Sequence, residues 1–69
     1  MSYPKPEGVV YQVEKKLVDG EIKLKYYEES RFTEGSTLQK LHAAQNRREE
    51  LIKMYGETEW KWFTAEVED

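Results

Sequence analysis

Residues 9–32 read VVYQVEKKLV-DG-EIKLKYYEESRF, two alternating runs on either side of an Asp-Gly pair. Asp-Gly favours a type I′ turn, because both central residues of that turn need a positive φ. A two-residue turn sets Leu17 opposite Ile22 and, further along, Val13 opposite Tyr26. One face of this hairpin is then mostly apolar and carries Val9, Tyr11, Val13, Leu17, Ile22, Leu24 and Tyr26. The other face is mostly charged, and a slip of one residue would destroy the separation.

A helix is predicted over residues 37–55. Ser36 and Gln39 have the spacing of a capping box, and Gly56 stands where helices commonly end. Apolar residues recur along one side of the segment, as in a helix that lies on a sheet: Leu38, Leu41, Ala44, Leu51, Ile52 and Tyr55. Residues 59–67, EWKWFTAEV, are rich in aromatic and β-branched residues and predict a third strand.

These elements predict an α+β fold of the order ββαβ. A third strand beside the second would be parallel to it, whereas a third strand beside the first makes every pair antiparallel. We therefore expect a three-stranded antiparallel sheet in the order 2-1-3, with the helix packed on one face. Residues 8–69 are expected to form this single small domain. Residues 1–7, which contain both prolines, are expected to be a flexible lead-in.

Composition restricts the class of protein. A chain of 69 residues buries a small core, and the absence of cysteine removes disulfides and thiolate metal sites as a source of stability. The sequence has no signal-peptide pattern and no apolar run of about 18 residues, so we expect a cytoplasmic protein without a membrane contact. The net charge of −3 is too small to indicate nucleic acid by attraction alone.

No arrangement of residues indicates catalysis, a metal ion or a cofactor. The single histidine, His42, has no carboxylate three or four positions away and is interpreted as a residue at the edge of the helix's apolar side. The four glycines are scattered and form no phosphate-binding loop. We therefore expect a protein that is not an enzyme and that has no cofactor.

One charged residue stands in the middle of the helix's apolar side. This residue is Arg48, and Glu28 lies on the apolar face of the hairpin, which the helix is expected to cover. We predict a partly buried, structural ion pair between Arg48 and Glu28. The alternative is that Arg48 extends its charge past the edge of the sheet into solvent.

The third strand carries large side chains on both faces. Trp60 and Trp62 point one way, while Phe63, Ala65 and Val67 point the other way. One helix covers one face, so we expect the second set under the helix and the tryptophans on the open face. The alternative is a β-bulge that turns both sets inward, or a loose, partly wrapped edge strand. The predicted binding residues are the tryptophans and three hairpin neighbours: Trp60, Trp62, Tyr27, Val10 and Lys25.

Two classes of ligand fit such an aromatic face. The first is another protein, or a second copy of the chain, because interfaces favour Trp and Tyr as anchors. The second is single-stranded nucleic acid, stacked on the aromatic residues with phosphates near Lys16, Lys23, Lys25 and Lys61. Acidic residues on the same face oppose the nucleic-acid interpretation. In size, lack of cysteine and self-contained design, the chain resembles the small accessory proteins that bacteriophages make to bind and redirect a host factor.

Overall fold

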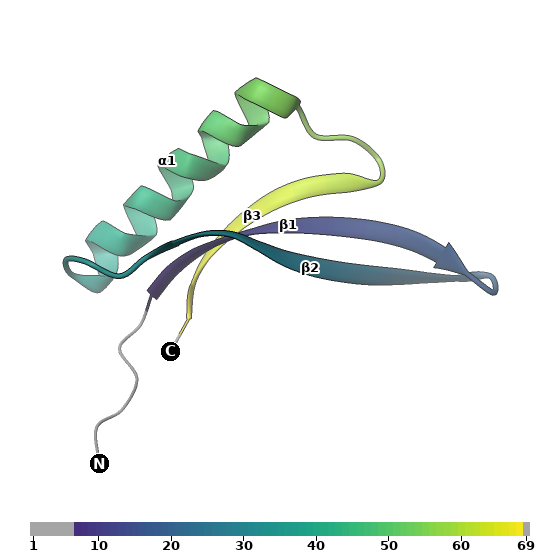
Figure 1. Ribbon diagram of the computed structural model, residues 1–69, viewed down its shortest axis with the longest axis horizontal. Coiled ribbons are helices and arrows are strands. Elements are labelled where there is room, and N and C mark those ends of the chain that lie inside the picture. The colour runs from purple at the N-terminus through teal and green to yellow at the C-terminus, as the bar shows by residue number, and fades with distance from the viewer. Residues whose placement is uncertain (1–6, 69) are drawn as a thin grey trace, which may run out of the picture.

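The computed structural model describes residues 7–68 of the chain. Its elements are β1 (Glu7–Val18), β2 (Glu21–Phe32), α1 (Thr37–Tyr55) and β3 (Lys61–Glu68). The strands form one sheet in the order β2-β1-β3, both pairings are antiparallel, and α1 lies on one face (Figure 1). The predicted fold and strand order are confirmed. Residues 1–6 of the expected lead-in lie outside the described residues, and β1 already includes its last residue, Glu7.

Local signals set the hairpin and the helix as expected. Asp19 and Gly20 both have a positive φ, 51° and 80°, as a type I′ turn requires. The predicted cross-strand pairs Leu17–Ile22 and Val13–Tyr26 are both present, and the same register continues to Tyr11–Glu28. At the start of α1, the Gln39 N–H donates to Ser36 Oγ over 3.2 Å, and the Ser36 N–H donates to Gln39 Oε1 over 2.8 Å. This reciprocal capping box explains why the helix begins where the sequence predicts.

A β-bulge in β2 changes the hairpin near its base. Tyr11 pairs with Glu28, but Val10 pairs with Ser30, so Glu29 is an extra residue without a partner of its own. Beyond the bulge, every β2 side chain is on the opposite face from the one that simple alternation gives. The bulge brings Phe32 onto the face that α1 covers, where it packs against the core.

The face under the helix is the opposite of the predicted one. Among the described residues, the buried cluster between the sheet and α1 contains Val10, Ala44, Leu51 and Phe63. In β1 and β3, Val10 pairs with Ala65 and Gln12 pairs with Phe63, so the even-numbered side of β1 faces the helix. The prediction that α1 covers the face of Val13, Leu17 and Ile22 is therefore wrong. We call the covered face the helix side and the other the open face.

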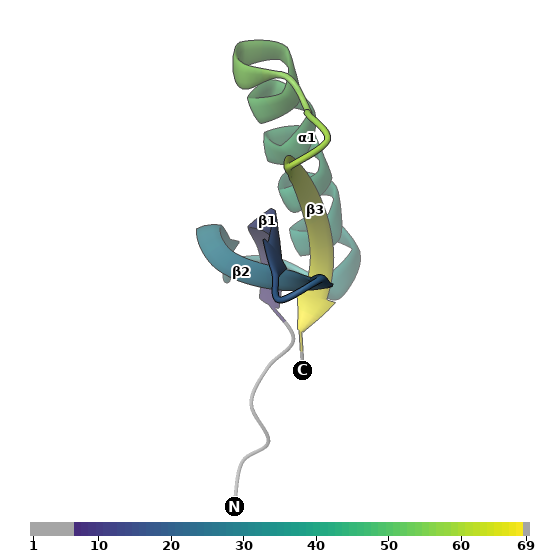
Figure 2. The same ribbon diagram turned by 90° about the vertical axis from the view of Figure 1, so that its right-hand side faces the viewer.

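The reach of α1 explains this difference. Seen along the hairpin, the helix rises behind β3, and the arm part of β2 lies to the side, beyond β1 (Figure 2). Pairing with β3 ends at Glu14–Lys61, and the Lys15 N–H donates to the Trp60 carbonyl over 2.9 Å. Residues 16–25 continue beyond as a two-stranded hairpin arm that diverges from the helix (Figure 1). The apolar alternation of the hairpin thus continues into a region that the helix does not reach.

Candidate protein-binding face

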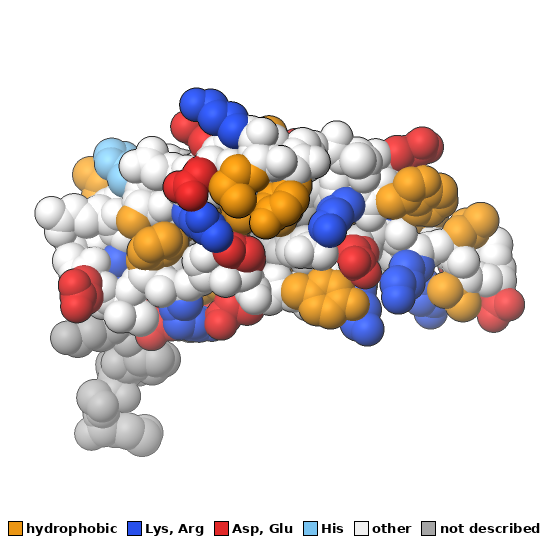
Figure 3. All heavy atoms as spheres, turned by 45° about the horizontal axis from the view of Figure 1, so that its top comes forward, with side chains coloured by type: hydrophobic (Ala, Val, Ile, Leu, Met, Phe, Trp, Pro, Cys, Tyr) orange, Lys and Arg blue, Asp and Glu red, His pale blue; other side chains and the backbone are white. Residues whose placement is uncertain are grey.

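Five large hydrophobic side chains are exposed on the open face around the hairpin arm. They have between 46% and 68% of their surface exposed and are Leu17, Ile22, Leu24, Tyr26 and Trp60. We call them the arm patch. Cross-strand pairing sets the four hairpin residues on one face, and the bond from Lys15 to Trp60 brings the tryptophan alongside them. Figure 3, which brings the helix toward the viewer, shows separate hydrophobic side chains at the surface of the arm among basic and acidic ones.

A small hollow lies within the arm patch. It has a volume of about 170 Å³ and is lined by Lys15, Leu17, Ile22, Glu59 and Trp60. A protein cavity of about 150 Å³ holds a benzene molecule, so this hollow has room for one aromatic or branched aliphatic side chain. Its lining is mostly apolar, with one cation and one carboxylate that could orient a polar neighbour of that side chain.

The other aromatic residues of the open face cover the sheet rather than project from it. Trp62 pairs with Val13 and is half-buried, and Lys15 Nζ lies 4.9 Å from the centre of the Trp62 ring. The rings of Tyr11 and Tyr26 meet edge to face, with centroids 6.4 Å apart. Val13 is fully buried between these side chains. On the open face, aromatic side chains therefore cover the sheet near its base, whereas the apolar side chains along the arm are exposed.

Only two of the five predicted binding residues lie on the open face. These are Trp60 and Trp62, as expected. The placement of Val10 there is wrong, because Val10 is fully buried under α1. The placement of Tyr27 and Lys25 is also wrong: they pair with Gln12 and Glu14 on the helix side. The error follows from the reversed assignment of the hairpin faces. The arm-patch residues of the hairpin were recognisable as apolar, but the pattern indicated that they were covered.

The predicted ion pair between Arg48 and Glu28 does not form. Glu28 lies on the open face, whereas Arg48 donates from Nε to the Phe63 carbonyl over 2.8 Å and lies 3.6 Å from the carboxylate of Glu57. Glu57 also accepts from the Phe63 N–H over 3.0 Å. The alternative interpretation, in which Arg48 extends to the sheet edge, is closer to the structure, although its charge binds that edge instead of passing it.

An ion pair between the helix and the sheet does form, but it joins Arg47 and Glu29, the residues next to Arg48 and Glu28 in the sequence. Arg47 donates to both carboxylate oxygens of Glu29, over 2.7 Å and 3.2 Å, and also to Glu50 over 2.8 Å. The hydrogen bonds from Arg47 lower the pKa of Glu29, against the opposing effect of burial. Glu29 reaches Arg47 because it is the extra residue of the bulge, a signal that periodicity alone does not contain.

Replacing Glu29 with glutamine is expected to lower the free energy of unfolding by about 1 kcal/mol at pH 7, since the pair is only partly buried. The pKa of Glu29 is lower in the folded chain, so its stabilising effect is present above the ordinary glutamate pKa. That effect is lost as the pH falls through the folded value. Urea unfolding over a pH series should therefore show the full difference at pH 7 and a shrinking difference as the pH falls below the ordinary glutamate pKa. Glu50→Gln, on the exposed side of Arg47, is the control and should cost less than half as much.

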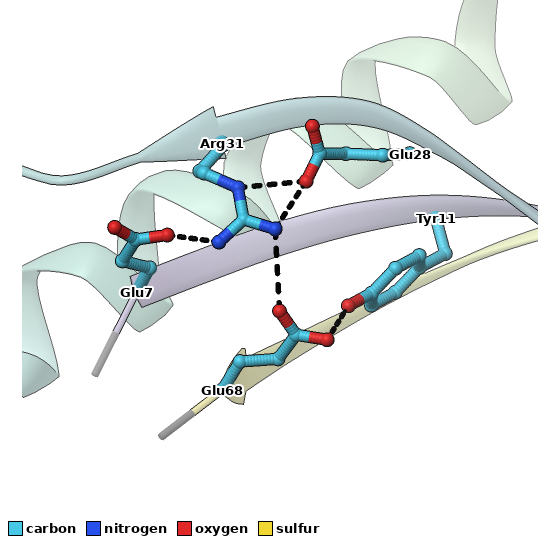
Figure 4. Close-up of polar contacts among 5 residues, drawn as sticks. All are labelled: Glu7, Tyr11, Glu28, Arg31 and Glu68. Carbon is cyan, nitrogen blue, oxygen red and sulfur yellow. Dashed lines mark hydrogen bonds and ion pairs between the residues drawn. The ribbon is translucent and has the colours of Figure 1, made fainter. Parts of the chain in front are cut away.

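A second group of charges holds the base of the open face together. Arg31 binds Glu7, Glu28 and Glu68, and the Tyr11 hydroxyl donates to Glu68 (Figure 4). The hydrogen bonds from Arg31 to Glu7 and Glu28 raise the pKa of Arg31. Because these residues come from all three strands, the group ties the sheet together at the end opposite the arm. Its carboxylates are occupied by Arg31 and Tyr11, which favours a structural role.

The lysines proposed to contact phosphates lie away from the tryptophans. Lys16, Lys23 and Lys25 are on the helix side, as their pairing with each other and with Glu14 shows, and Lys61 pairs there with Glu14. Trp60 and Trp62 are on the open face, with Lys15 as their neighbouring cation. An aromatic surface with a basic border, which stacking on single strands requires, is therefore not formed by the predicted residues.

Comparisons with known proteins add no assignment. No protein family model matches the chain, and no curated protein or solved structure is significantly similar to it. Within residues 7–68, no helix is long and apolar enough to cross a membrane. The same part of the chain contains no cluster of three or more His, Cys, Asp or Glu side chains placed to hold a metal ion. The arm patch is the feature of this surface from which a function can be argued.

Proposed function

We propose that this protein is a non-enzymatic module of the cytoplasm that binds another protein through the arm patch. The observation that carries the proposal is the exposure of the most regularly patterned apolar residues in the chain, 46% to 68% for each member. Small monomeric proteins seldom expose a contiguous apolar surface unless it serves an interaction. Two of the five residues are Trp and Tyr, which interfaces favour as anchors.

The geometry also supports a specific kind of contact. The patch is built on paired strands, so its side chains are held in fixed relative positions and lose little freedom on binding. The hollow beside Trp60 accepts one side chain of a partner, and charged residues surround the patch. A host factor bound in this way would agree with the resemblance to small phage accessory proteins.

Replacing Ile22 with glutamate is expected to weaken binding of the partner and to raise its Kd by about 30-fold or more, because a charge would enter the centre of the apolar contact. Tyr55→Glu is the matched control: Tyr55 lies on α1, and its side chain has the same exposure as Ile22, 68%. Partners would be captured from cells by cross-linking to each variant, quantified by mass spectrometry and then measured as purified proteins.

Both substituted residues are exposed, so the circular dichroism spectrum and melting temperature of each variant should match those of the unaltered chain. Loss of one partner with Ile22→Glu alone supports the proposal. If every captured protein remains bound to Ile22→Glu and to Tyr55→Glu equally, the arm patch is not the binding surface.

A further inference from the structure

The two outer edges of the sheet differ in how their backbone groups are satisfied. At the β3 edge, Lys61 exchanges backbone hydrogen bonds with Thr58, over 2.8 Å and 3.3 Å. Phe63 donates to Glu57 and accepts from Arg48. Side chains and a turn thus occupy the edge of β3 along its first half. Such blocking is a common way in which proteins keep an edge strand from pairing with another chain.

The β2 edge has no corresponding cover in the described part of the chain. The Lys15 N–H points toward β3, where it binds Trp60, so Lys15 and its partner Leu24 form a pair without mutual backbone hydrogen bonds. The N–H and C=O of Leu24 consequently point away from β1. By the two-residue repeat, those of Ile22 and Tyr26 do the same. Within residues 7–68, no strand, turn or side chain binds these outward groups.

The residues with outward backbone groups are also members of the arm patch. Ile22, Leu24 and Tyr26 present their side chains on the open face and their hydrogen-bonding groups at the free edge. The intervening residues, Lys23 and Lys25, present two ammonium groups on the helix side. A strand added at this edge would therefore meet apolar side chains on one face and cations on the other.

We propose that the partner binds by adding an extended segment to the edge of β2, with alternating apolar and acidic side chains. The apolar ones would lie beside Ile22, Leu24 and Tyr26, and the acidic ones beside Lys23 and Lys25. This inference rests on the proposed function and specifies how the partner binds. Strand addition gives affinity through backbone hydrogen bonds and specificity through alternate side chains.

Charge favours a foreign acidic strand over a second copy of the chain. The antiparallel self-pairing that matches residues 21–27 along their whole length sets Leu24 opposite Leu24. It also sets Lys23 opposite Lys25 twice. Like charges directly opposite each other destabilise a strand pair. The two lysines thus act against self-pairing while they attract carboxylates.

The test uses amide hydrogen exchange of the full chain, followed by NMR, with a synthetic nonapeptide of alternating valine and glutamate. Exchange at Ile22, Leu24 and Tyr26 is expected to slow by about tenfold or more at saturating peptide, because these N–H groups gain acceptors. Lys23 and Lys25, whose N–H groups point toward β1, should change little. A valine–lysine peptide should bind about tenfold more weakly at low salt, from two reversed charge pairs.

The double variant Lys23→Glu with Lys25→Glu should reverse this preference for the acidic peptide. Equal binding of both peptides, or no slowing at the three amides, would overturn the inference. Slowing that develops with protein concentration and without peptide would show that a second copy occupies the edge. If the Ile22→Glu variant loses a partner, but that partner does not slow exchange at the three amides of the unaltered chain, strand addition is refuted and the proposed function stands. Retention of the partner by Ile22→Glu would refute the proposed function itself.

Discussion

Phe63→Ala is expected to lower the free energy of unfolding by about 3–5 kcal/mol, the usual cost of removing a buried aromatic ring. Phe63 is 3% exposed and packs with Val10, Ala44 and Leu51 between the sheet and α1. Domains of this size have only about 5 kcal/mol or slightly more of total stability, so the variant should keep about 0–2 kcal/mol and be only marginally folded at room temperature. Urea unfolding followed by circular dichroism, started in a stabilising osmolyte if necessary, measures the loss.

Trp60→Ala is the matched comparison for this result. Trp60 is also a large aromatic residue near the start of β3, but 55% of its surface is exposed, and we expect a cost below about 1 kcal/mol. The ratio of the two decreases in unfolding free energy shows which face of the sheet the helix covers. Equal losses, or a larger loss for Trp60, would place the core on the face that the structure leaves open.

Gly8→Ala is the second substitution with a large expected effect, a loss of about 3 kcal/mol, at the upper end for overpacking. A Cβ at this position would lie 2.7 Å from the carbonyl carbon of Lys40 and closer still to its oxygen. The obstacle is the backbone of α1, which cannot turn aside as a flexible side chain can. The helix would have to move away from β1, and the contacts around Val10 would open.

The control for Gly8 is Gly20→Ala in the hairpin turn. Gly20 has a φ of 80°, but no atom lies within 4 Å of the Cβ position, so only the left-handed backbone is strained. We expect a loss of about 1–2 kcal/mol. Thermal unfolding by calorimetry compares the two variants. A Gly8→Ala protein as stable as the unaltered chain would contradict the close approach of the helix to β1.

Local chemistry made the elements of this fold predictable. Asp19-Gly20 defines the turn, the turn defines the register, and Ser36 with Gln39 defines the start of the helix. Each of these effects acts within a few residues. The strand order followed from the preference for a sheet in which every pair of strands is antiparallel.

The covered face was not predictable in the same way. Alternation shows which residues share a face, but it does not show how far along the hairpin a helix reaches. Glu29 changes the alternation by one residue, and nothing in its type or spacing marks it as the extra residue of a bulge. The reversed face accounts for the misplacement of Val10, Tyr27 and Lys25 and for the wrong ion pair of Arg48. Trp60 and Trp62 were placed correctly because Phe63 and Ala65 do belong to the helix side.

The central claim is that the arm patch is exposed on the isolated chain and available to another protein. Hydroxyl-radical footprinting, read by mass spectrometry over a dilution series, tests it most directly. We predict fast oxidation of Ile22, Leu24, Tyr26 and Trp60 at every concentration, and slow oxidation of Leu51 and Phe63. Slow oxidation of the arm patch at all concentrations would show that these side chains are buried within the chain, which contradicts the claim that they are exposed. Protection that grows with concentration would mean that a second copy, and not a foreign protein, covers it.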